Sequence, residues 1–436
     1  MTKIHITTLG CPKNTVDSGH LSGAMASQGL IPVPEIEDAD VLLVNTCGFI
    51  RDAKEESIEE ILRLAKMKKG QGKKLVVFGC LAKRYYDELV KEIPEIDAIF
   101  GVGEDARILE YCKGQGQNDF TGPWTPDPGE PPTVGGPYAS YAYLKIADGC
   151  NKNCTFCVIP SIRGKFRSVP REDILKEAET YVKQGVRELI LVAQDITNYG
   201  RESREYNLVS LLKDMASIKG DFSIRLLYLY PTEITEGLLR LIASEEKILN
   251  YLDIPLQHSE DRMLRLMGRR GSRKEYIKLI RTIRKTIPGV ALRTTFIVGF
   301  PGETEEDFNG LADFLEEIRF DRLGVFKYSR EEGTPADKLK GQVPEKVKER
   351  RLDEIMRRQA AISLEKNLEL VGWRFPAVID EIDGDTAIAR LYSHAPEIDG
   401  VVILEQAGPA LVGDIVTVEI VEAYDYDVKG KIINNK

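Results

Sequence analysis

The sequence predicts an α/β protein of three parts: an open parallel α/β sheet, a partial (β/α) barrel, and a small all-β barrel. Two observations indicate this class. Short apolar runs alternate with amphipathic stretches as far as Gly372, and beyond it the period changes to short alternating strands. The length of 436 residues fits two or three domains, because a domain has about 150 residues.

The first part, residues 1–120, contains four apolar runs that are typical of buried parallel strands. Amphipathic helical patterns follow the runs, as at residues 51–66. We therefore expect an open α/β layer. The runs lie at residues 4–6, 41–44, 75–78 and 96–100.

Residues 121–137 contain six prolines and four glycines, which neither a helix nor a central strand would tolerate, so we expect a linker there. The second part, residues 138–371, contains six strand-like runs, most of them separated by helical patterns. This order predicts a partial parallel barrel with its active site at the carboxyl ends of the strands. The runs lie at residues 141–146, 189–193, 224–230, 251–254, 292–298 and 323–328.

A charged helix at residues 345–369 ends the second part. Its apolar side predicts a packing face, and we expect its arginines on a solvated face. These arginines are Arg350, Arg351, Arg357 and Arg358. The third part, residues 372–436, should be a small β-barrel, because it contains short strand-like runs between Gly and Asp turns. The runs lie at residues 387–391, 401–404 and 415–421.

Composition predicts a soluble globular protein, with 42% hydrophobic and 30% charged residues. The first residues lack the features of a signal peptide, and no apolar run approaches the roughly 20 residues that span a bilayer. We therefore expect a cytoplasmic protein with no membrane partner. Disulfides are rare in that reducing compartment, so clusters among the seven cysteines indicate metal binding or catalysis.

Cys150, Cys154 and Cys157, here called the loop thiols, lie within eight residues directly after the first strand of the second part. Three thiolates this close can bind one iron–sulfur cube from a single loop and leave one iron open. The alternative is zinc, but structural zinc takes four ligands, and no fourth cysteine or histidine lies nearby. We expect a redox enzyme whose chemistry starts with a single electron.

Cys11, Cys47 and Cys80, here called the N-terminal thiols, each follow a predicted strand of the first part. The carboxyl ends of parallel strands share one edge of a sheet, where open α/β folds bind ligands. We expect a second cluster there, again with an iron free of protein sulfur. Three ordinary buried cysteines are the alternative. Cys112 has no partner or motif and is expected to be structural.

The spacing of the loop thiols at the end of a first barrel strand resembles the radical S-adenosylmethionine superfamily, over residues 138–330. The resemblance implies that the open iron chelates S-adenosylmethionine and that one electron splits it to a 5′-deoxyadenosyl radical. It also implies cofactor contacts from the loop and from later strand ends. These residues are Phe156, beside the adenine, Gln194, Gln257 and Gly299.

The order of the three parts resembles the methylthiotransferases over essentially the whole chain. Segments 9–18, 251–258 and 326–336 look like the members that modify the β-carbon of an aspartate in the twelfth protein of the small ribosomal subunit. One departure is Gly19-His20, where an acidic residue commonly follows Asp17-Ser18.

This second resemblance implies two [4Fe-4S] clusters and S-adenosylmethionine as cofactors, and a TRAM-like barrel as the third part. It assigns radical generation to the loop thiols and sulfur delivery to the N-terminal thiols. An electron donor such as flavodoxin or ferredoxin is implied as a partner.

Charge bears on the choice of substrate. The third part holds 12 acidic and 5 basic residues, a net charge of −7 out of −9 for the whole chain. A domain that grips tRNA should be basic, because phosphate neutralisation supplies most non-specific affinity. An acidic face suits a basic ribosomal protein instead. We therefore expect a protein rather than a nucleic acid as substrate; a merely solubilising surface is the alternative.

Two other functions stay open. A tRNA adenosine methylthiotransferase would use the same chemistry, and retention on total tRNA would favour it. A non-catalytic iron–sulfur sensor that binds ribosomes needs one cluster and no S-adenosylmethionine, so adenosine products would exclude it. A zinc-stabilised RNA-binding module is disfavoured by the acidic third part and by the cysteine spacing.

Overall fold

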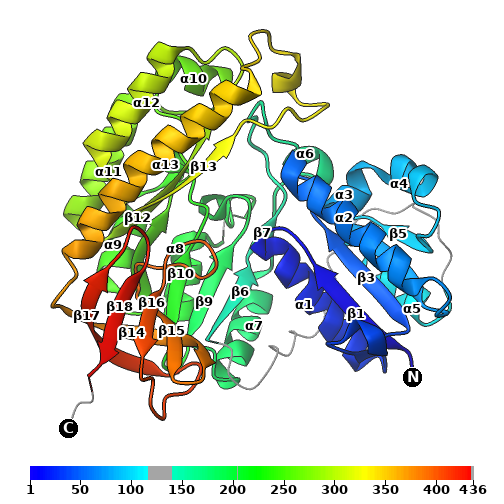
Figure 1. The fold of residues 1–436 in the computed structure, drawn as a ribbon. Helices are drawn as coiled ribbons and strands as arrows, with labels where there is room; N and C mark the ends of the chain where they lie inside the picture. Colours follow the sequence, from blue (N-terminus) through cyan, green and yellow to red (C-terminus); the bar gives the residue numbers. More distant parts are fainter. Residues whose placement is uncertain (116–139, 204, 434–436) are drawn as a thin grey trace.

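The three parts follow one another in the computed structural model, which describes residues 1–115, 140–203 and 205–433 (Figure 1). The linker predicted at 121–137 lies outside the described residues. Each part has a main sheet of its own, and the predicted residue boundaries between the parts stay predictions. None of the described helices is long and apolar enough to cross a membrane.

The first sheet is open and parallel, as predicted. Its order is β2-β1-β3-β4-β5, and every pair is parallel. Helices pack on both faces, which explains why the strands are apolar on both sides. The strands are β1 (Lys3–Thr8), β2 (Ile31–Pro32), β3 (Val41–Thr46), β4 (Lys74–Gly79) and β5 (Ala98–Phe100).

Two apolar cores hold these layers together. α1 (Pro12–Ser27) and α5 (Asp105–Cys112) contribute to the core on one face of the sheet, and Cys112 is buried in it. α2 (Arg51–Lys68) and α4 (Tyr86–Glu92) contribute to the core on the other face. The remaining helix, α3 (Cys80–Arg84), directly follows β4.

The second sheet has six parallel strands and stays open as a partial barrel. Their order follows the chain, β6-β9-β10-β11-β12-β13. These strands are β6 (Tyr141–Lys145), β9 (Glu188–Val192), β10 (Ser223–Leu226), β11 (Ile248–Asp253), β12 (Ala291–Val298) and β13 (Arg322–Lys327). All six lie at the runs that the sequence predicts.

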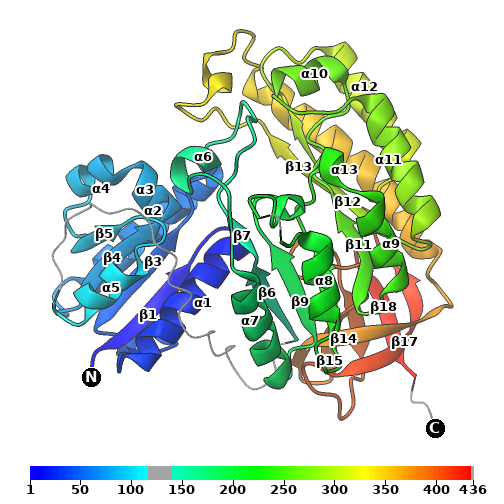
Figure 2. The ribbon, with the colours of Figure 1, turned by 180° about the vertical axis from the view of Figure 1, so that it is seen from behind.

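Helices lie along the outer face of this sheet, as both ribbon views show (Figures 1 and 2). The largest apolar core of the molecule lies between them and the strands. These helices are α7 (Arg171–Lys183), α8 (Leu208–Ala216), α9 (Glu236–Ser244), α11 (Arg273–Thr286) and α12 (Glu305–Ile318). The sheet thus leaves the carboxyl ends of its strands for a site, as the partial-barrel prediction requires.

Short elements surround those carboxyl ends. β7 (Ala147–Asp148) pairs antiparallel with β8 (Arg167–Ser168), and the connection between them carries the loop thiols and α6 (Ile159–Ile162). α10 (Asp261–Leu266) follows β11.

The long helix α13 (Glu345–Leu368) confirms the predicted packing helix but corrects its charged face. Ile355 and Ile362 are buried in the main core. Arg351, which we expected in solvent, is 2% exposed and forms an ion pair of 2.9 Å with Glu303. Helix periodicity could not show this, because the carboxylate that neutralises Arg351 lies on a loop before α12.

The third part is a closed barrel of order β14-β15-β16-β18-β17. The sequence pattern located β15, β16 and β17 but missed the other two. Pro376 interrupts the first strand, and Gly430 lies between two lysines in the last, so neither shows a clean alternation. The strands are β14 (Arg374–Asp383), β15 (Thr386–Arg390), β16 (Val402–Glu405), β17 (Ile415–Ala423) and β18 (Val428–Ile432).

The C-terminal barrel packs against the amino ends of the central strands. Glu188, the first residue of β9, forms ion pairs with Arg225 at 2.5 Å and with Arg390 at 2.8 Å. Asp399 accepts a hydrogen bond of 2.7 Å from the hydroxyl of Tyr251. Helix α1 of the N-terminal part packs along the edge strand β6, and its Val16 lies in a buried cluster with Val192 of β9 and Leu227.

Candidate active site

The N-terminal thiols lie at the carboxyl ends of adjacent strands. Cys11 precedes α1, Cys47 follows β3, and Cys80 is the first residue of α3 after β4. Their turns are in contact: a Cβ atom on Gly10 would lie 2.9 Å from the Cys47 sulfur, and one on Gly48 would lie 2.9 Å from the carbonyl carbon of Cys80. Glycine at these two positions lets the three turns meet at one edge of the sheet.

These three thiols differ in their electrostatic surroundings. Burial would raise the pKa of the Cys11 thiol, but the charges of Lys13 and Arg163 outweigh it and the net shift is downward. Burial raises the pKa of Cys47 to about 12 and also raises the pKa of Cys80. A cysteine binds metal as the thiolate, so a cluster here would displace protons, most easily from Cys11.

The loop thiols are all partly exposed. Cys150 Sγ accepts a hydrogen bond of 3.4 Å from the backbone N–H of Lys152, and the guanidinium of Arg269 donates one of 3.8 Å to Cys154 Sγ. The loop is anchored at Thr155, whose backbone N–H donates to a carbonyl just after α10 at 2.9 Å. The loop therefore has a fixed path and polar donors beside two of its sulfurs.

Neither set has the geometry of a single-metal site. Within the ranges that the structure describes, no three Cys, His, Asp or Glu side chains lie close enough to hold one metal ion. Three thiolates on one zinc would lie about 4 Å apart. Ligands of a multi-iron cluster bind separate irons, so they need not lie as close together as the ligands of one ion.

The two thiol sets meet where the first part packs on the second. Cys80 lies in a small apolar cluster with Val158 and Ile162, and Val158 is the residue after Cys157. The thiols of both sets therefore lie at the mouth of the partial barrel.

A buried arginine joins the parts at this point. Arg163, which follows α6, donates to Asp148 at 2.9 Å and to two α1 residues, Asn14 at 2.7 Å and Asp17 at 2.9 Å. Burial would raise the pKa of Asp17, but Lys145 and Arg163 outweigh it and hold the pKa well below its usual range. Asp17 is therefore ionised, and the contacts of Arg163 with Asp17 and Asp148 fix α1 against the loop that carries Cys157.

A second ionic contact lies on the other side of the N-terminal part. Glu331, after β13, is 2% exposed and pairs with Lys54 of α2 at 2.8 Å and with Arg84 at 2.5 Å. Neither this contact nor that of Arg163 could be found from the sequence, because each pairs charges far apart in the chain with no motif to connect them.

Two of the predicted cofactor contacts lie close to the loop thiols. Phe156, between the last two cysteines, packs edge-on against Phe300 with ring centroids 6.4 Å apart. The Gln194 amide nitrogen donates to Asp148 at 3.0 Å, and its oxygen is buried with no hydrogen-bond partner in the described part of the chain. An unpaired buried acceptor is unusual in a folded protein, and a polar ligand at the mouth could satisfy it.

The other two predicted contacts have clear structural features. Gln257 follows β11 in a left-handed conformation, with φ of 73°, and such strained residues cluster at functional sites. Gly299, also left-handed, leaves room for α13: a Cβ atom there would lie 2.3 Å from the Lys348 side chain. Packing thus explains this glycine without a ligand, and its cofactor contact stays a prediction.

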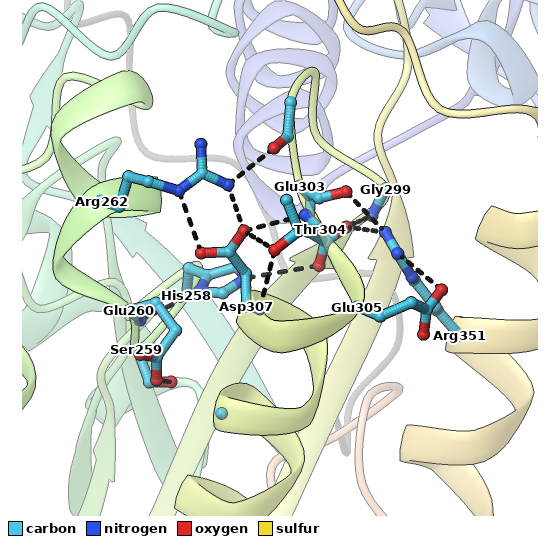
Figure 3. Close-up of polar contacts among 12 residues, drawn as sticks. His258, Ser259, Glu260, Arg262, Gly299, Glu303, Thr304, Glu305, Asp307 and Arg351 are labelled. Atoms are coloured by element: carbon cyan, nitrogen blue, oxygen red, sulfur yellow. Dashed lines mark hydrogen bonds and ion pairs between the residues drawn. The ribbon is translucent and has the colours of Figure 1, made fainter.

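Figure 3 shows what holds the turn that follows β12. The buried Glu303 carboxylate accepts hydrogen bonds from the Gly299 N–H and from Arg351, and it lies 3.4 Å from His258 Nε2. The same helix start is fixed by Arg262, which pairs with Asp307. These charged residues have partners within the protein and serve to position the turn.

Comparison with family models divides the chain in the same order. The radical SAM superfamily model matches residues 144–315, and the TRAM domain model matches residues 371–433. The model of uncharacterized protein family UPF0004 matches residues 3–101, the region of the N-terminal thiols.

Curated relatives match over nearly the whole chain. A protein of Thermodesulfovibrio yellowstonii named ribosomal protein uS12 methylthiotransferase RimO is 59% identical over 99% of this chain and 100% of its own length. The protein of the same name from Carboxydothermus hydrogenoformans is 46% identical over the same shares.

Solved structures share the fold at low identity. The cobalamin-dependent S-adenosylmethionine radical enzyme OxsB aligns with a TM-score of 0.55 and 12% identity, covering 81% of this chain and 55% of its own. The radical S-adenosylmethionine methyltransferase TsrM of Kitasatospora setae aligns with a TM-score of 0.53 and 16% identity, covering 88% of this chain and 82% of its own. Both comparisons support the predicted fold class.

Proposed function

The chain belongs to the RimO family of ribosomal protein uS12 methylthiotransferases, within the radical SAM superfamily, and on that basis we propose its reaction. It attaches a methylthio group to the β-carbon of an aspartate in uS12, the twelfth protein of the small ribosomal subunit. One observation carries the proposal: the packing of Cys80 against the segment that follows Cys157 brings both thiol sets to one mouth. Radical generation and sulfur delivery could then act on one carbon.

The donor sets fit the cofactors that this reaction needs. Each set offers three cysteines, the number that binds a cube with one iron left open. We assign one [4Fe-4S] cluster to the loop thiols and a second to the N-terminal thiols. When bound, the clusters and S-adenosylmethionine would supply the electron, the adenosyl radical and the methylthio sulfur.

The chain's own residues hold this chemistry in place. Arg269 donates to Cys154 Sγ and to the Pro255 carbonyl, so it holds a positive charge beside the loop thiols. Arg163 plays the equivalent part for the N-terminal thiols, because its charge lowers the pKa of Cys11. The unpaired oxygen of Gln194 offers an acceptor at the same mouth.

A radical suits the proposed substrate position. The β-carbon of an aspartate carries an unactivated C–H bond, which is too weakly acidic for a His or Glu base. A flavodoxin or ferredoxin would serve as electron donor, and the ribosomal protein would be met in the cytoplasm. The acidic C-terminal part, with a net charge of −7, suits a basic protein partner better than tRNA.

The test is mass spectrometry of uS12 and, separately, of total tRNA. Each would be incubated anaerobically with reconstituted enzyme, reductant, sulfide and S-adenosylmethionine. We expect uS12 to gain the mass of one methylthio group on an aspartate, and tRNA to remain unchanged. Enzyme with alanine at the three loop thiols is the matched control and should leave both substrates unmodified.

Other outcomes would point to the rival functions. A methylthio group on tRNA alone would mean that the charge argument failed and that the enzyme modifies adenosine. Absence of both 5′-deoxyadenosine and a modified product would favour a non-catalytic iron–sulfur sensor. Formation of 5′-deoxyadenosine without modified uS12 or modified tRNA would support the radical chemistry but would show that uS12 is not the substrate.

A further inference from the structure

Lys13 is a buried cation in the contact between the first two parts. It lies in the first turn of α1, two residues after Cys11, and is 8% exposed. Its ammonium group lies 3.7 Å from the centroid of the Tyr228 ring. Tyr228 comes from the central part, just beyond the carboxyl end of β10. The lysine therefore spans the space between the N-terminal thiols and the barrel mouth.

Lys13 differs from the other cations around this mouth. Lys145 pairs with Asp17, and Arg163 pairs with Asp17 and Asp148. The charges that act on Lys13 come from Tyr228, Cys11 and Arg163, and in the described part of the chain no carboxylate forms an ion pair with it. It is a buried positive charge whose neighbours supply no carboxylate.

Such a charge is unfavourable unless a partner compensates it. A buried ammonium loses its hydration, and a cation–π contact returns only part of that loss. Arg163 adds repulsion, and the compensation within the chain comes from the Cys11 sulfur and the Tyr228 hydroxyl, neither of which is a carboxylate. An anion from outside the chain would be a better partner, and it can approach because Cys11 and Tyr228 are partly exposed.

The backbone supports a binding role for this contact. Tyr228 has φ of 62°, a conformation that a non-glycine residue adopts only when its surroundings impose it. Its N–H donates to the Asp253 carboxylate at 3.1 Å, which ties the residue to β11. The ring is therefore held under Lys13 by the central sheet, and the ammonium group is positioned before a substrate arrives.

We propose that Lys13 binds the side-chain carboxylate of the substrate aspartate. The assignment rests on the proposed function. A carboxylate paired with Lys13 would place the β-carbon, one bond from the carboxyl carbon, beside the N-terminal thiols and above the Tyr228 ring. It would also explain selection of aspartate over asparagine, because a neutral amide leaves the ammonium uncompensated.

The rival role for Lys13 is compensation of the thiolate charge at the N-terminal cluster. Three variants separate the roles: Lys13→Gln removes the charge, Lys13→Arg keeps it, and Lys54→Gln removes an interface lysine that pairs with Glu331 away from the thiols. Each holoenzyme would be assayed with uS12 and with uS12 whose target aspartate is replaced by asparagine. The readouts are kcat/KM for methylthio transfer, uS12 affinity by fluorescence anisotropy without S-adenosylmethionine, and iron content.

We expect the unsubstituted enzyme to prefer the aspartate substrate by at least about 30-fold, the effect of a desolvated charge pair. Lys13→Gln should lose most of this preference in both transfer and affinity while keeping its iron. Lys13→Arg should recover part of it, and Lys54→Gln should retain all of it.

Two results would overturn this assignment and leave the proposed function unaffected. An unchanged aspartate preference in Lys13→Gln would show that the ammonium does not contact the carboxylate, and loss of iron specific to that variant would assign the lysine to the cluster. An enzyme that leaves uS12 unmodified would overturn the proposed function and, with it, this assignment.

Discussion

The loop thiols and the N-terminal thiols are assembled in opposite ways. The loop thiols come from one segment of the central part, and the cation beside them, Arg269, belongs to that part as well. The N-terminal thiols come from three separate turns, and Arg163, whose charge acts on Cys11 and Cys80, comes from the central part. The first set is thus complete within its own part, whereas the second is completed only when the two parts pack together.

This difference gives the interface between the parts a chemical role. Arg163 and Glu331 are both buried and ion-paired across it. Buried ion pairs add little net stability but fix register, since leaving one partner alone is costly. The contacts therefore determine where the N-terminal thiols lie relative to the loop thiols.

Replacing one cysteine from each set tests this division most strongly. In Cys157→Ala the loop cluster loses a ligand, so we expect 5′-deoxyadenosine and methylthio transfer both to fall to background. In Cys80→Ala only the N-terminal cluster loses a ligand, so 5′-deoxyadenosine should still form while methylthio transfer falls to background. Chromatography of the nucleoside and mass spectrometry of uS12 measure the two products.

The control for this pair is Cys112→Ala, because Cys112 is the last residue of α5 and is buried in an apolar core, so both products should persist. Equal loss of 5′-deoxyadenosine in the Cys80 and Cys157 variants would show that the two thiol sets act as one unit and not separately.

Arg163→Gln should reduce methylthio transfer less than the cysteine replacements do. The guanidinium contacts Asn14, Asp17 and Asp148, and its loss leaves one buried and one partly buried carboxylate short of a partner. We expect methylthio transfer to fall about 10–100-fold, the usual effect of removing a residue that supports metal ligands. Formation of 5′-deoxyadenosine should change far less.

Lys54→Gln weakens the same interface at Glu331 without touching a thiol and serves as the matched variant. If both variants lose transfer to the same extent, Arg163 contributes only to packing of the parts and not specifically to the N-terminal thiols.

The smallest expected effect is a difference in alkylation rate between two of the N-terminal thiols. In metal-free protein Cys11, with its lowered pKa, should be alkylated by iodoacetamide at pH 7.5 at least about tenfold faster than Cys47, whose pKa is about 12. A lower pKa gives a larger thiolate fraction at a given pH. The Cys47 rate should therefore keep rising between pH 7 and 9, while the Cys11 rate levels off first.

Peptide mass spectrometry after timed quenching measures these rates, and urea-unfolded protein should show nearly equal rates. Similar rates for Cys11 and Cys47 in the folded protein would mean that Lys13 and Arg163 do not favour the Cys11 thiolate.

Much of the fold could be predicted because strands buried on both faces are nearly continuous apolar runs. All six central strands lie at predicted runs. The barrel strands β14 and β18 were missed because Pro376 and Gly430 break their alternation. Arg351 was placed in solvent because helical periodicity cannot reveal a carboxylate that another loop brings to it.

The sequence by itself determined which cysteines are the candidates for the chemistry. The loop thiols are recognisable because neighbours in the chain must be neighbours in space, and the N-terminal thiols because parallel strands end at one edge of a sheet. Only the tertiary structure decided how the sets face each other. Arg163, Asp17 and Lys13 acquire their roles from contacts between distant segments, and such contacts depend on how the folded parts pack, which no local pattern encodes.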